Sequence, residues 1–580
     1  MSDFLDVTTS LTARRWVGPT DDLMRQAEAL AQHTGLPVAL CQTLARRGVS
    51  AEEADRFLDP KLKDLLPDPL TLKDMGKAAA RFLAALKARQ RIAVFADYDV
   101  DGGTSAALLL TWLRDMGHHA TLYIPDRIDE GYGPNEPAMA ALAQDHDLIV
   151  CVDCGTLSHG PIAAAQGADV IVLDHHLGGE TLPDCVAVVN PNRQDESGDL
   201  AHLCAASVVF LMLVEVNRLM RAEGQKGPDL MAALDLVALA TVADVAPLIG
   251  VNRALVRQGL KVMAGRHRIG LRALADVARM DTAPTSYSLG FLLGPRINAG
   301  GRIGAADLGA RLLATQDPIE AQALAERLDQ LNTERREIEN AVREAAIAQA
   351  EARGLDGPLV WAAGEGWHPG VVGIVASRLK ESSNRPAIVI GFDGDEGKGS
   401  GRSISGVDLG ASIQKLAAEG LLVKGGGHKM AAGLTVMRDK LEPAMARLSE
   451  LLAKQGAGDG GPADLKLDGM LMPGAATIDL ITRLEAAGPF GAAAPAPRFA
   501  FPSCAIHFAR RIGESHLKIS FSDGLGPRLE AICFGAYDGP LGPALESHGG
   551  ARFHLAGRLE INTWGGRQSV QLRLEDAARA

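Results

Sequence analysis

The feature that most constrains the fold is an alternation of short apolar runs with longer alanine- and leucine-rich stretches between Leu72 and Ala246. The apolar runs have the length of strands, and the stretches between them have the length of helices. The expected strands are Ile92–Ala96, Thr121–Ile124, Leu148–Val152, Val170–Leu173 and Val186–Val189. Repeated strand–helix–strand units predict a parallel sheet, in which ligands bind beyond the carboxyl ends of the strands.

Acidic and imidazole side chains follow three of these strands directly. Alternate residues of an extended chain point to one side, so three carboxylates at every second position would project together. The residues are Asp97, Asp99 and Asp101 after the first strand, Asp153 after the third, and Asp174, His175 and His176 after the fourth. All of them are therefore expected at one edge of the sheet.

A further carboxylate, Asp244, ends an otherwise apolar helical stretch, where a lone buried charge is costly. Like charges this close repel unless a cation lies among them, and carboxylate oxygens suit Mg²⁺ or Mn²⁺. The alternatives are that Asp153 and Asp174 cap helices and that Asp244 pairs with an arginine. For the whole set together, a metal site is the better hypothesis.

Whole-chain properties limit the class of protein. A chain of 580 residues is too long for one core, and its net charge of −12 argues against a uniformly basic nucleic-acid binder. We expect no export signal and no membrane segment, and seven scattered cysteines fit a reducing, cytoplasmic location. Cys151 and Cys154 have CxxC spacing, but no second pair follows, so core packing is favoured over a zinc or redox site.

Glycine-rich segments with cations are candidate phosphate sites. In the segment 125–133, Arg127 could clamp a phosphate and Tyr132 could stack on a base. In the segment 294–302, expected to be a loop, glycines would let the backbone approach a phosphate near three donor side chains, Arg296, Asn298 and Arg302. Two more basic glycine loops are expected at 398–403 and 424–429. The alternative for each is an ordinary surface loop or turn.

Two further segments complete the outline. Asp317 is a candidate N-cap before Pro318, and the helical run that follows lasts to Gly354, about 54 Å if unbroken. Beyond a glycine-rich linker, four segments alternate apolar with polar residues, as antiparallel strands with one wet face do: His516–Phe521, Arg528–Phe534, Ala551–Ile561 and Ser569–Leu574. An OB-type barrel that binds single strands is favoured over a purely structural β domain.

Four segments in order resemble the successive motifs of the DHH phosphoesterase superfamily: Asp97-Tyr-Asp-Val-Asp-Gly102, Val152-Asp-Cys-Gly155, Asp174-His-His176 and Thr241-Val-Ala-Asp244. The match is closer to the single-strand-specific 5′ exonucleases of that superfamily. It extends to Gly294-Pro-Arg-Ile-Asn298 and Gly425-Gly-Gly-His428 and covers essentially the whole chain. Three departures affect no proposed metal ligand: Gly178 where proline is usual, alanine in place of glycine within 203–207, and the missing asparagine before proline within 488–495.

The resemblance implies two divalent metal ions, Mn²⁺ or Mg²⁺, held by Asp97, Asp99, Asp101, Asp153, His175 and Asp244. Asp99 would hold the first ion, and Asp101, His175 and Asp244 the second. Asp153 would bridge both, whereas Asp97 is either a direct ligand of the first ion or an acid behind the ligands. The catalytic residues would be Asp153 and His176, the latter facing the scissile phosphate.

The implied activity is a metal-dependent phosphodiesterase, a 5′–3′ exodeoxyribonuclease that degrades single-stranded DNA to mononucleotides in repair and recombination. A helicase and a single-strand-binding protein are possible partners, and no membrane is involved. Substrate contacts are expected from Arg127, Tyr132, Arg296, Asn298, Arg302, Ser400, Arg402 and His428. The alternatives are a phosphodiesterase for short RNA or cyclic dinucleotides, and a non-catalytic scaffold or single-strand-binding protein; the retained acids and histidines argue against the last two.

The expected fold class is α/β: a parallel-sheet DHH domain, a long connecting helix, a smaller α/β DHH-associated domain and a C-terminal OB-type β-barrel. The expected boundaries are 1–75 for an N-terminal helical segment, 76–316 for the DHH catalytic domain, 317–354 for the connecting helix, 355–455 for the DHH-associated substrate-binding domain and 463–580 for the OB-fold nucleic-acid-binding domain.

Overall fold

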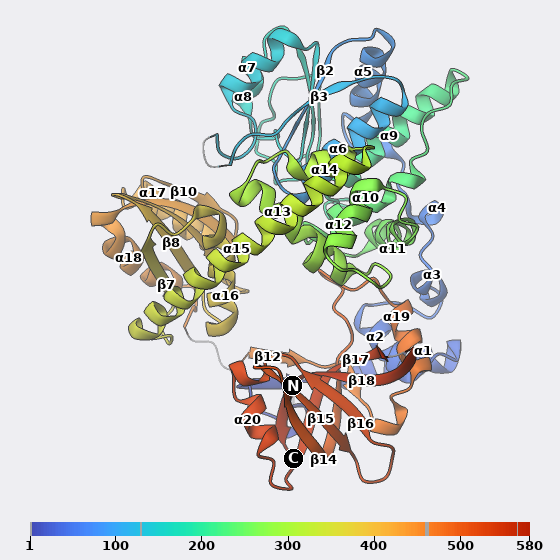
Figure 1. Cartoon of the computed structure of the whole chain (residues 1–580), viewed down its shortest axis with the longest axis vertical. Coiled ribbons are helices and arrows are strands. Elements are labelled where there is room, and N and C mark those ends of the chain that lie inside the picture. The colour runs from blue at the N-terminus through green and yellow to red at the C-terminus, as the bar shows by residue number, and fades with distance from the viewer. Residues whose placement is uncertain (1–2, 128–129, 459–462, 565) are drawn as a thin grey trace. The chain divides into compact units, whose positions relative to one another are not determined.

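The structure, a computed structural model, describes residues 3–127, 130–458, 463–564 and 566–580. The chain divides into two compact units (Figure 1). The larger unit contains residues 66–247 and 258–460, and the smaller unit contains residues 1–65, 248–257 and 461–580. The N-terminal segment therefore belongs with the C-terminal part of the chain.

The larger unit begins with a five-stranded parallel sheet in the order β3-β2-β4-β5-β6. Its strands are β2 (Ile92–Ala96), β3 (Ala120–Tyr123), β4 (Leu148–Val152), β5 (Asp169–Leu173) and β6 (Ala187–Val189). The predicted strands are confirmed to within one residue at each end. Since β2, β4 and β5 are neighbours, the segments that follow them emerge side by side at one edge.

Helices cover both faces of this sheet (Figure 1). Phe95 on β2 and Cys151 on β4 point into the core against α7 and α8, and Cys154 lies in the same core. The helices of this part of the chain are α5 (Met75–Lys87), α6 (Val100–Asp115), α7 (Glu136–Asp145), α8 (His159–Ala164), α9 (Ala205–Ala222), α10 (Leu234–Ala243), α12 (Ile269–Val277), α13 (Gly294–Ile303) and α14 (Leu308–Ala314). All seven cysteines of the chain are free, and both members of the CxxC pair are buried.

The expected glycine-rich loop at 294–302 is wrong: this segment is helix α13, preceded by a π-helical turn, Ser288–Leu293. The glycines allow close packing instead. A Cβ on Gly301 would lie 2.7 Å from the carbonyl oxygen of Tyr98, and a Cβ on Gly294 would lie 3.2 Å from the Cβ of Ala243. The helix thus lies directly against the backbone near the predicted metal ligands.

The long helix is confirmed as α15 (Pro318–Arg353), 36 residues long. The Asp317 side chain accepts a hydrogen bond from the backbone N–H of Ile319, and the proline at the first position suits a helix start. Leu324, Leu328 and Leu331 form part of its buried face. The helix leads from the first α/β domain into the second (Figure 1).

The second α/β domain contains a five-stranded sheet in the order β10-β11-β9-β8-β7, in which only β7 and β8 are parallel. Its elements are β7 (Val360–Glu365), α16 (Pro369–Ser383), β8 (Ala387–Asp393), β9 (Glu396–Arg402), α17 (Leu409–Ala418), β10 (Lys424–Gly427), β11 (Ala431–Met437) and α18 (Leu441–Ala453). The two basic glycine segments expected as loops at 398–403 and 424–429 therefore lie largely in β9 and β10. Their glycines leave space for packing, since a Cβ on Gly399 would lie 2.8 Å from Ile390.

The smaller unit contains an OB-like sheet that closes on itself. The six-stranded order is β13-β14-β15-β16-β18-β17, and β14 also pairs with β17. The elements of the unit are β1 (Arg14–Val17), α1 (Asp21–Thr34), α2 (Val38–Arg46), α3 (Ala54–Leu58), α4 (Leu62–Leu65), β12 (Ala463–Lys466), β13 (Gly469–Met470), α19 (Ile478–Ala486), β14 (Phe499–Ile512), β15 (His516–Ser522), β16 (Leu529–Cys533), α20 (Leu541–Glu546), β17 (Arg552–Trp564) and β18 (Arg567–Arg579), and α11 (Gly250–Ala264) begins in it.

Contacts within the smaller unit join distant parts of the sequence. Strand β1 pairs in parallel with β12, and buried Trp16 donates its indole N–H to Asp576 over 2.8 Å. Arg47 and Arg253 both donate to the carbonyl oxygen of Ala487 just beyond the end of α19. In the described part of the chain, no helix combines the length and the apolar character needed to cross a membrane.

Candidate active site

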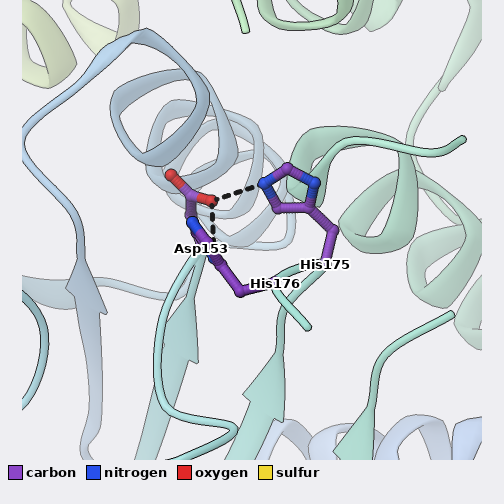
Figure 2. Close-up of side chains that lie close together, drawn as sticks. All are labelled: Asp153, His175 and His176. Atoms are coloured by element: carbon purple, nitrogen blue, oxygen red, sulfur yellow. Dashed lines mark ion pairs between the residues drawn. The ribbon is translucent and has the colours of Figure 1, made fainter. Parts of the chain in front are cut away.

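The site is built at the carboxyl ends of β2, β4 and β5. Asp97 follows β2 and is 3% exposed, and Asp153 follows β4 and is 1% exposed. Asp153 has a φ of +60°, in the left-handed region that non-glycine residues seldom adopt outside turns and functional sites. His175 and His176 follow β5 on the neighbouring loop (Figure 2).

The first turn of α6 positions two more carboxylates. Asp99 caps this helix, because its side chain accepts hydrogen bonds from the N–H groups of Asp101 and Gly102. Asp101 is fully buried and accepts hydrogen bonds from the N–H groups of Ala205 and Ala206 over 2.6 and 2.9 Å. These donors stand at the start of α9, where the helix dipole favours a negative charge. Because both donors are backbone N–H groups, alanine in place of glycine at these positions retains the two hydrogen bonds.

His175 lies among three carboxylates. Its Nε2 is 3.3 Å from an oxygen of Asp153, 3.6 Å from one of Asp101 and 3.8 Å from one of Asp244. Figure 2 shows the rings of His175 and His176 both directed at the Asp153 carboxylate. Segments that follow β4 and β5, the start of α6 and the end of α10 therefore meet at one point.

His176 is oriented from behind by Asp174, which the sequence placed with the acids at the sheet edge, with helix capping as the alternative. The Asp174 carboxylate accepts from Nδ1 of His176 over 2.8 Å and from the Thr156 hydroxyl over 2.6 Å. The hydroxyl of Tyr132 lies about 3 Å from the His176 ring and donates to the carbonyl oxygen of Asp153. Tyr132, predicted to stack on a base, thus lies at the centre of the site.

Two asparagines hold the backbone of the histidine pair. Asn190 donates to the carbonyl oxygen of His176, and Asn192 donates to that of His175, over 2.7 and 2.6 Å. Both stand in the turn after β6. Neither asparagine could be assigned from the sequence, because nothing in the local pattern ties a short polar turn to a particular loop.

The electrostatics of the site favour a bound cation. Burial and next the charge of Asp99 raise the pKa of both Asp97 and Asp153 well above the usual value. Burial and next the charge of Asp101 raise the pKa of Asp244 to about 8. Burial alone would lower the pKa of His176, but the hydrogen bond and charge of Asp174 outweigh it and raise this pKa to about 9.

The donor set fits divalent metal ions. One ligand atom each from Asp97, Asp99 and Asp153 lies within 4.8 Å of the others, and the same holds for Asp101, His175 and Asp244. One oxygen of Asp97 and one of Asp153 are buried without a hydrogen-bond partner in the described structure. Buried carboxylate oxygens left in this way are suited to a hard cation such as Mn²⁺ or Mg²⁺.

Several predicted substrate residues gather beside these acids. The Arg127 guanidinium lies over the ring of Tyr98, 5.1 Å from its centroid. Burial first, and then the charge of Arg127, lower the pKa of Arg302 to about 10 and also lower the pKa of Arg402. Arg302 donates to the carbonyl oxygen of Gly370 at the start of α16, so it connects the two α/β domains.

The remaining predicted substrate residues have different surroundings. Ser400 accepts a hydrogen bond from Arg402 on the same strand, and His428 is exposed at the end of β10. Asn298 accepts from the N–H of Val100, between two of the predicted ligands. Arg296 donates to Asp329 on α15 and to the carbonyl oxygen of Leu292, so the contacts seen for it are structural.

The parallel sheet, the acidic and histidine cluster and the domain order define a member of the DHH phosphoesterase class. The chain matches the DHH family, N-terminal domain over residues 91–241, the DHHA1 domain over 356–454 and the RecJ OB domain over 467–576. Relatives identify the branch: the chain belongs to the RecJ family. It is therefore a metal-dependent exonuclease.

Two curated relatives and one solved structure illustrate the match. The chain is 39% identical to the single-stranded-DNA-specific exonuclease RecJ of Dickeya dadantii, over 93% of this chain and 96% of the relative. It is 37% identical to that of Escherichia coli, over 97% and 98%. The crystal structure of RecJ in complex with Mn²⁺ from Thermus thermophilus matches with a TM-score of 0.80 and 30% identity, over 97% of this chain and 79% of that chain.

A second structure of the same Thermus protein contains Mg²⁺ and matches with a TM-score of 0.73 at 28% identity. Together with the acidic and histidine groups described above, these structures identify Mn²⁺ or Mg²⁺ as the cofactor.

Proposed function

We propose that this protein removes mononucleotides from the 5′ end of single-stranded DNA by hydrolysing phosphodiester bonds with two divalent ions. The observation that carries this proposal is the convergence of two ligand groups, Asp97–Asp99–Asp153 and Asp101–His175–Asp244, at the carboxyl edge of the parallel sheet. The substrate follows from the family, whose curated members are named as single-strand-specific exonucleases.

In this proposal each group holds one ion, and Asp153 is shared between them because its oxygen also lies 3.3 Å from His175. When bound, such ions lower the pKa of a coordinated water and stabilise the oxygens of an in-line displacement at phosphorus. The chain supplies a fixed set of donors, since Asp101 is held by two backbone N–H groups and Asp99 by the first turn of α6.

His176 stabilises the charge that develops on the scissile phosphate. The hydrogen bond and charge of Asp174 raise the pKa of His176 and favour the protonated ring, and Asp174 holds the proton on Nδ1. Tyr132 lies against the same ring and limits its rotation. A positioned donor of this kind stabilises the transition state more than the bound substrate, because negative charge on the phosphate grows there. Only such a difference raises the rate.

Cations of the second α/β domain grip the strand. Arg402 and Ser400 stand next to each other on β9, and burial first and then the charge of Arg127 lower the pKa of Arg402. Two like charges held together without an anion are costly, and a phosphate between them removes this cost. We assign the 5′-terminal phosphate and its neighbour to this group and to His428.

The test uses purified protein and one oligonucleotide labelled at the 5′ or the 3′ end, supplied as a single strand and as a blunt duplex. With Mn²⁺ or Mg²⁺, mononucleotides should appear from the 5′ end of the single strand only, and EDTA should stop the reaction. Cleavage from the 3′ end, or of dinucleotides in preference to longer strands, would contradict the proposal and favour a small-substrate phosphodiesterase.

The partners follow from the need for a single strand. We propose that a helicase unwinds duplex to supply the single strand and that a single-strand-binding protein binds the same strand as the nuclease. The process is cytoplasmic DNA repair and recombination. The support is the family and the substrate, since a strand-specific nuclease cannot start from intact duplex. Addition of either protein to a duplex assay should raise the rate of mononucleotide release, and no effect from either would contradict the partnership.

A further inference from the structure

An exposed aromatic pair lies outside the site described so far. The rings of Tyr287 and Phe291 stack with their centroids 4.9 Å apart and their planes at 23°. The two side chains are 54% and 66% exposed, although both belong to a well-packed segment. In the described part of the larger unit, the other aromatic side chain exposed to this degree is Tyr132 at the active site. Large exposed aromatic groups are costly and commonly mark a binding surface.

Phe291 belongs to the π-helical turn Ser288–Leu293, and Tyr287 is the residue directly before it. Leu289 and Leu293 of this turn are fully buried, and Thr285 and Ser288 exchange hydrogen bonds at its start. π-Helical turns are rare and occur frequently at functional sites. The buried leucines anchor the backbone, so the two rings are held at the surface in one arrangement.

This turn packs against the elements that carry metal ligands. A Cβ on Gly290 would lie 3.5 Å from Cγ1 of Val242, and one on Gly294 would lie 3.2 Å from the Cβ of Ala243, the residue before Asp244. The Cβ position on Gly294 also lies 4.0 Å from Cγ2 of Val100, the residue that stands between Asp99 and Asp101 in the sequence. The aromatic pair is therefore fixed relative to both ligand groups.

An apolar residue extends the surface toward the metal ligands. Val245 follows Asp244 directly, is 69% exposed and has a φ of +60°, a strained conformation for a β-branched residue. Its N–H donates to the carbonyl oxygen of Val242, whose side chain lies next to Gly290 of the π-helical turn. Exposed apolar groups thus stand on both sides of the contact between α10 and the π-helical turn.

We propose that Tyr287 and Phe291 form a stacking platform for bases of the single strand, on the 3′ side of the phosphate being cleaved. The proposal rests on the proposed function: an exonuclease that starts at the 5′ end holds one terminal nucleotide, and the rest of its substrate extends in the 3′ direction. Flat rings with a free outer face bind bases of any sequence, as a non-specific nuclease requires. The phosphates would still be held by the cations named above.

The experiment compares Tyr287→Ala and Phe291→Ala with the unaltered chain on a 12-nucleotide strand in Mn²⁺. Loss of one base–aromatic stack should raise KM about five- to a hundredfold and leave kcat nearly unchanged. The same variants should show no loss on a strand in which the internal nucleotides are abasic, because that strand has phosphates but no bases to stack. Tyr287→Phe should keep the normal KM, since it keeps the ring.

Ile319→Ala is the matched control, because Ile319 is an exposed apolar residue of the same unit, 81% exposed at the start of α15. An unchanged KM on the 12-nucleotide strand, or an equal loss on the abasic strand, would overturn the platform. Strand binding measured by fluorescence anisotropy in EDTA gives a second readout. If the unaltered chain cut no single strand, the proposed function would fail, and this binding measurement would still decide whether the pair stacks on bases.

Discussion

Both α/β domains contain a five-stranded sheet. The first presents acids and histidines beyond its strand ends, and the second presents a serine and an arginine from within a strand. In the first, acids and histidines follow the carboxyl ends of parallel strands, so Asp97, Asp153 and His175 meet at one edge. In the second, Ser400 and Arg402 project from an antiparallel strand, β9, and helix α16 packs against them. A Cβ on Gly373 of that helix would lie only 3.0 Å from the Ser400 hydroxyl oxygen.

This difference separates two tasks. Buried acids whose pKa values are raised by burial and by one another require a cation, and cations perform the chemistry. Arg402 of the second domain is partly buried, its pKa is lowered by burial and then by the charge of Arg127, and such a cation is suited to an anion, here a phosphate of the substrate. Substitutions in the first domain should therefore lower kcat, and substitutions in the second should raise KM.

The largest effect is expected for Asp153→Asn. The amide removes the charge of the carboxylate that we propose both ions share, so kcat/KM should fall by more than about 1,000-fold. Manganese binding measured by calorimetry should weaken in the same variant. Asp145→Asn, an exposed acid at the end of α7, is the control and should behave as the unaltered chain. Activity of the Asp153 variant close to normal would remove the basis of the metal site.

His176→Ala should come next, with kcat reduced about 100- to 10,000-fold, the range for a positioned acid–base group. Metal binding should remain, because Asp101, His175 and Asp244 are intact in this variant. Asp174→Asn should give a smaller loss, about 10- to 100-fold, because it disturbs the orientation of His176 while the ring remains. Single-turnover rates and a manganese titration separate these outcomes, and equal loss of metal binding in both variants would contradict the assignment.

The positions of the acids could be predicted because strand ends are local features. The run Ile92–Ala96 ends in the sequence where β2 ends in the structure, and the parallel order then places the following acid beside Asp153. The start of α15 was predictable for a similar reason, since a cap and a proline act within one helical turn.

What could not be predicted depends on distant partners. Glycine permits a turn, but it also permits close packing, and only the position of Tyr98 shows that Gly301 does the latter. Asn190 and Asn192 are ordinary turn residues until their amides are seen on the carbonyl oxygens of the histidine pair. The pairing of β1 (Arg14–Val17) with β12 (Ala463–Lys466) joins segments far apart in the sequence, and no local pattern encodes it.

The second domain provides the next test. Arg402→Ala removes one cation that we expect on a phosphate, and a charged hydrogen bond contributes about 1.5–3 kcal/mol, so KM should rise about 10- to 100-fold. The kcat at saturating strand should stay near normal. Arg378→Ala is the control, since Arg378 is an exposed arginine on α16 that pairs with Glu381. A fall in kcat with an unchanged KM would place Arg402 with the chemistry and break the division between the domains.

The smallest effect is expected where a predicted substrate residue supports the first domain instead. The Asn298 side chain accepts the N–H of Val100, which lies between Asp99 and Asp101, and an unmade neutral hydrogen bond costs about 1 kcal/mol. If this support is its main task, Asn298→Ala should lower kcat about fivefold and raise the manganese concentration needed for half-maximal rate, with little change in KM for the strand. If Asn298 instead touches the substrate, KM should rise and the manganese dependence should stay normal. Asn384→Ala, in the turn after α16, provides the control, because that residue is remote in sequence and caps a helix end. The ratio of the two changes therefore assigns Asn298 to the acids or to the strand.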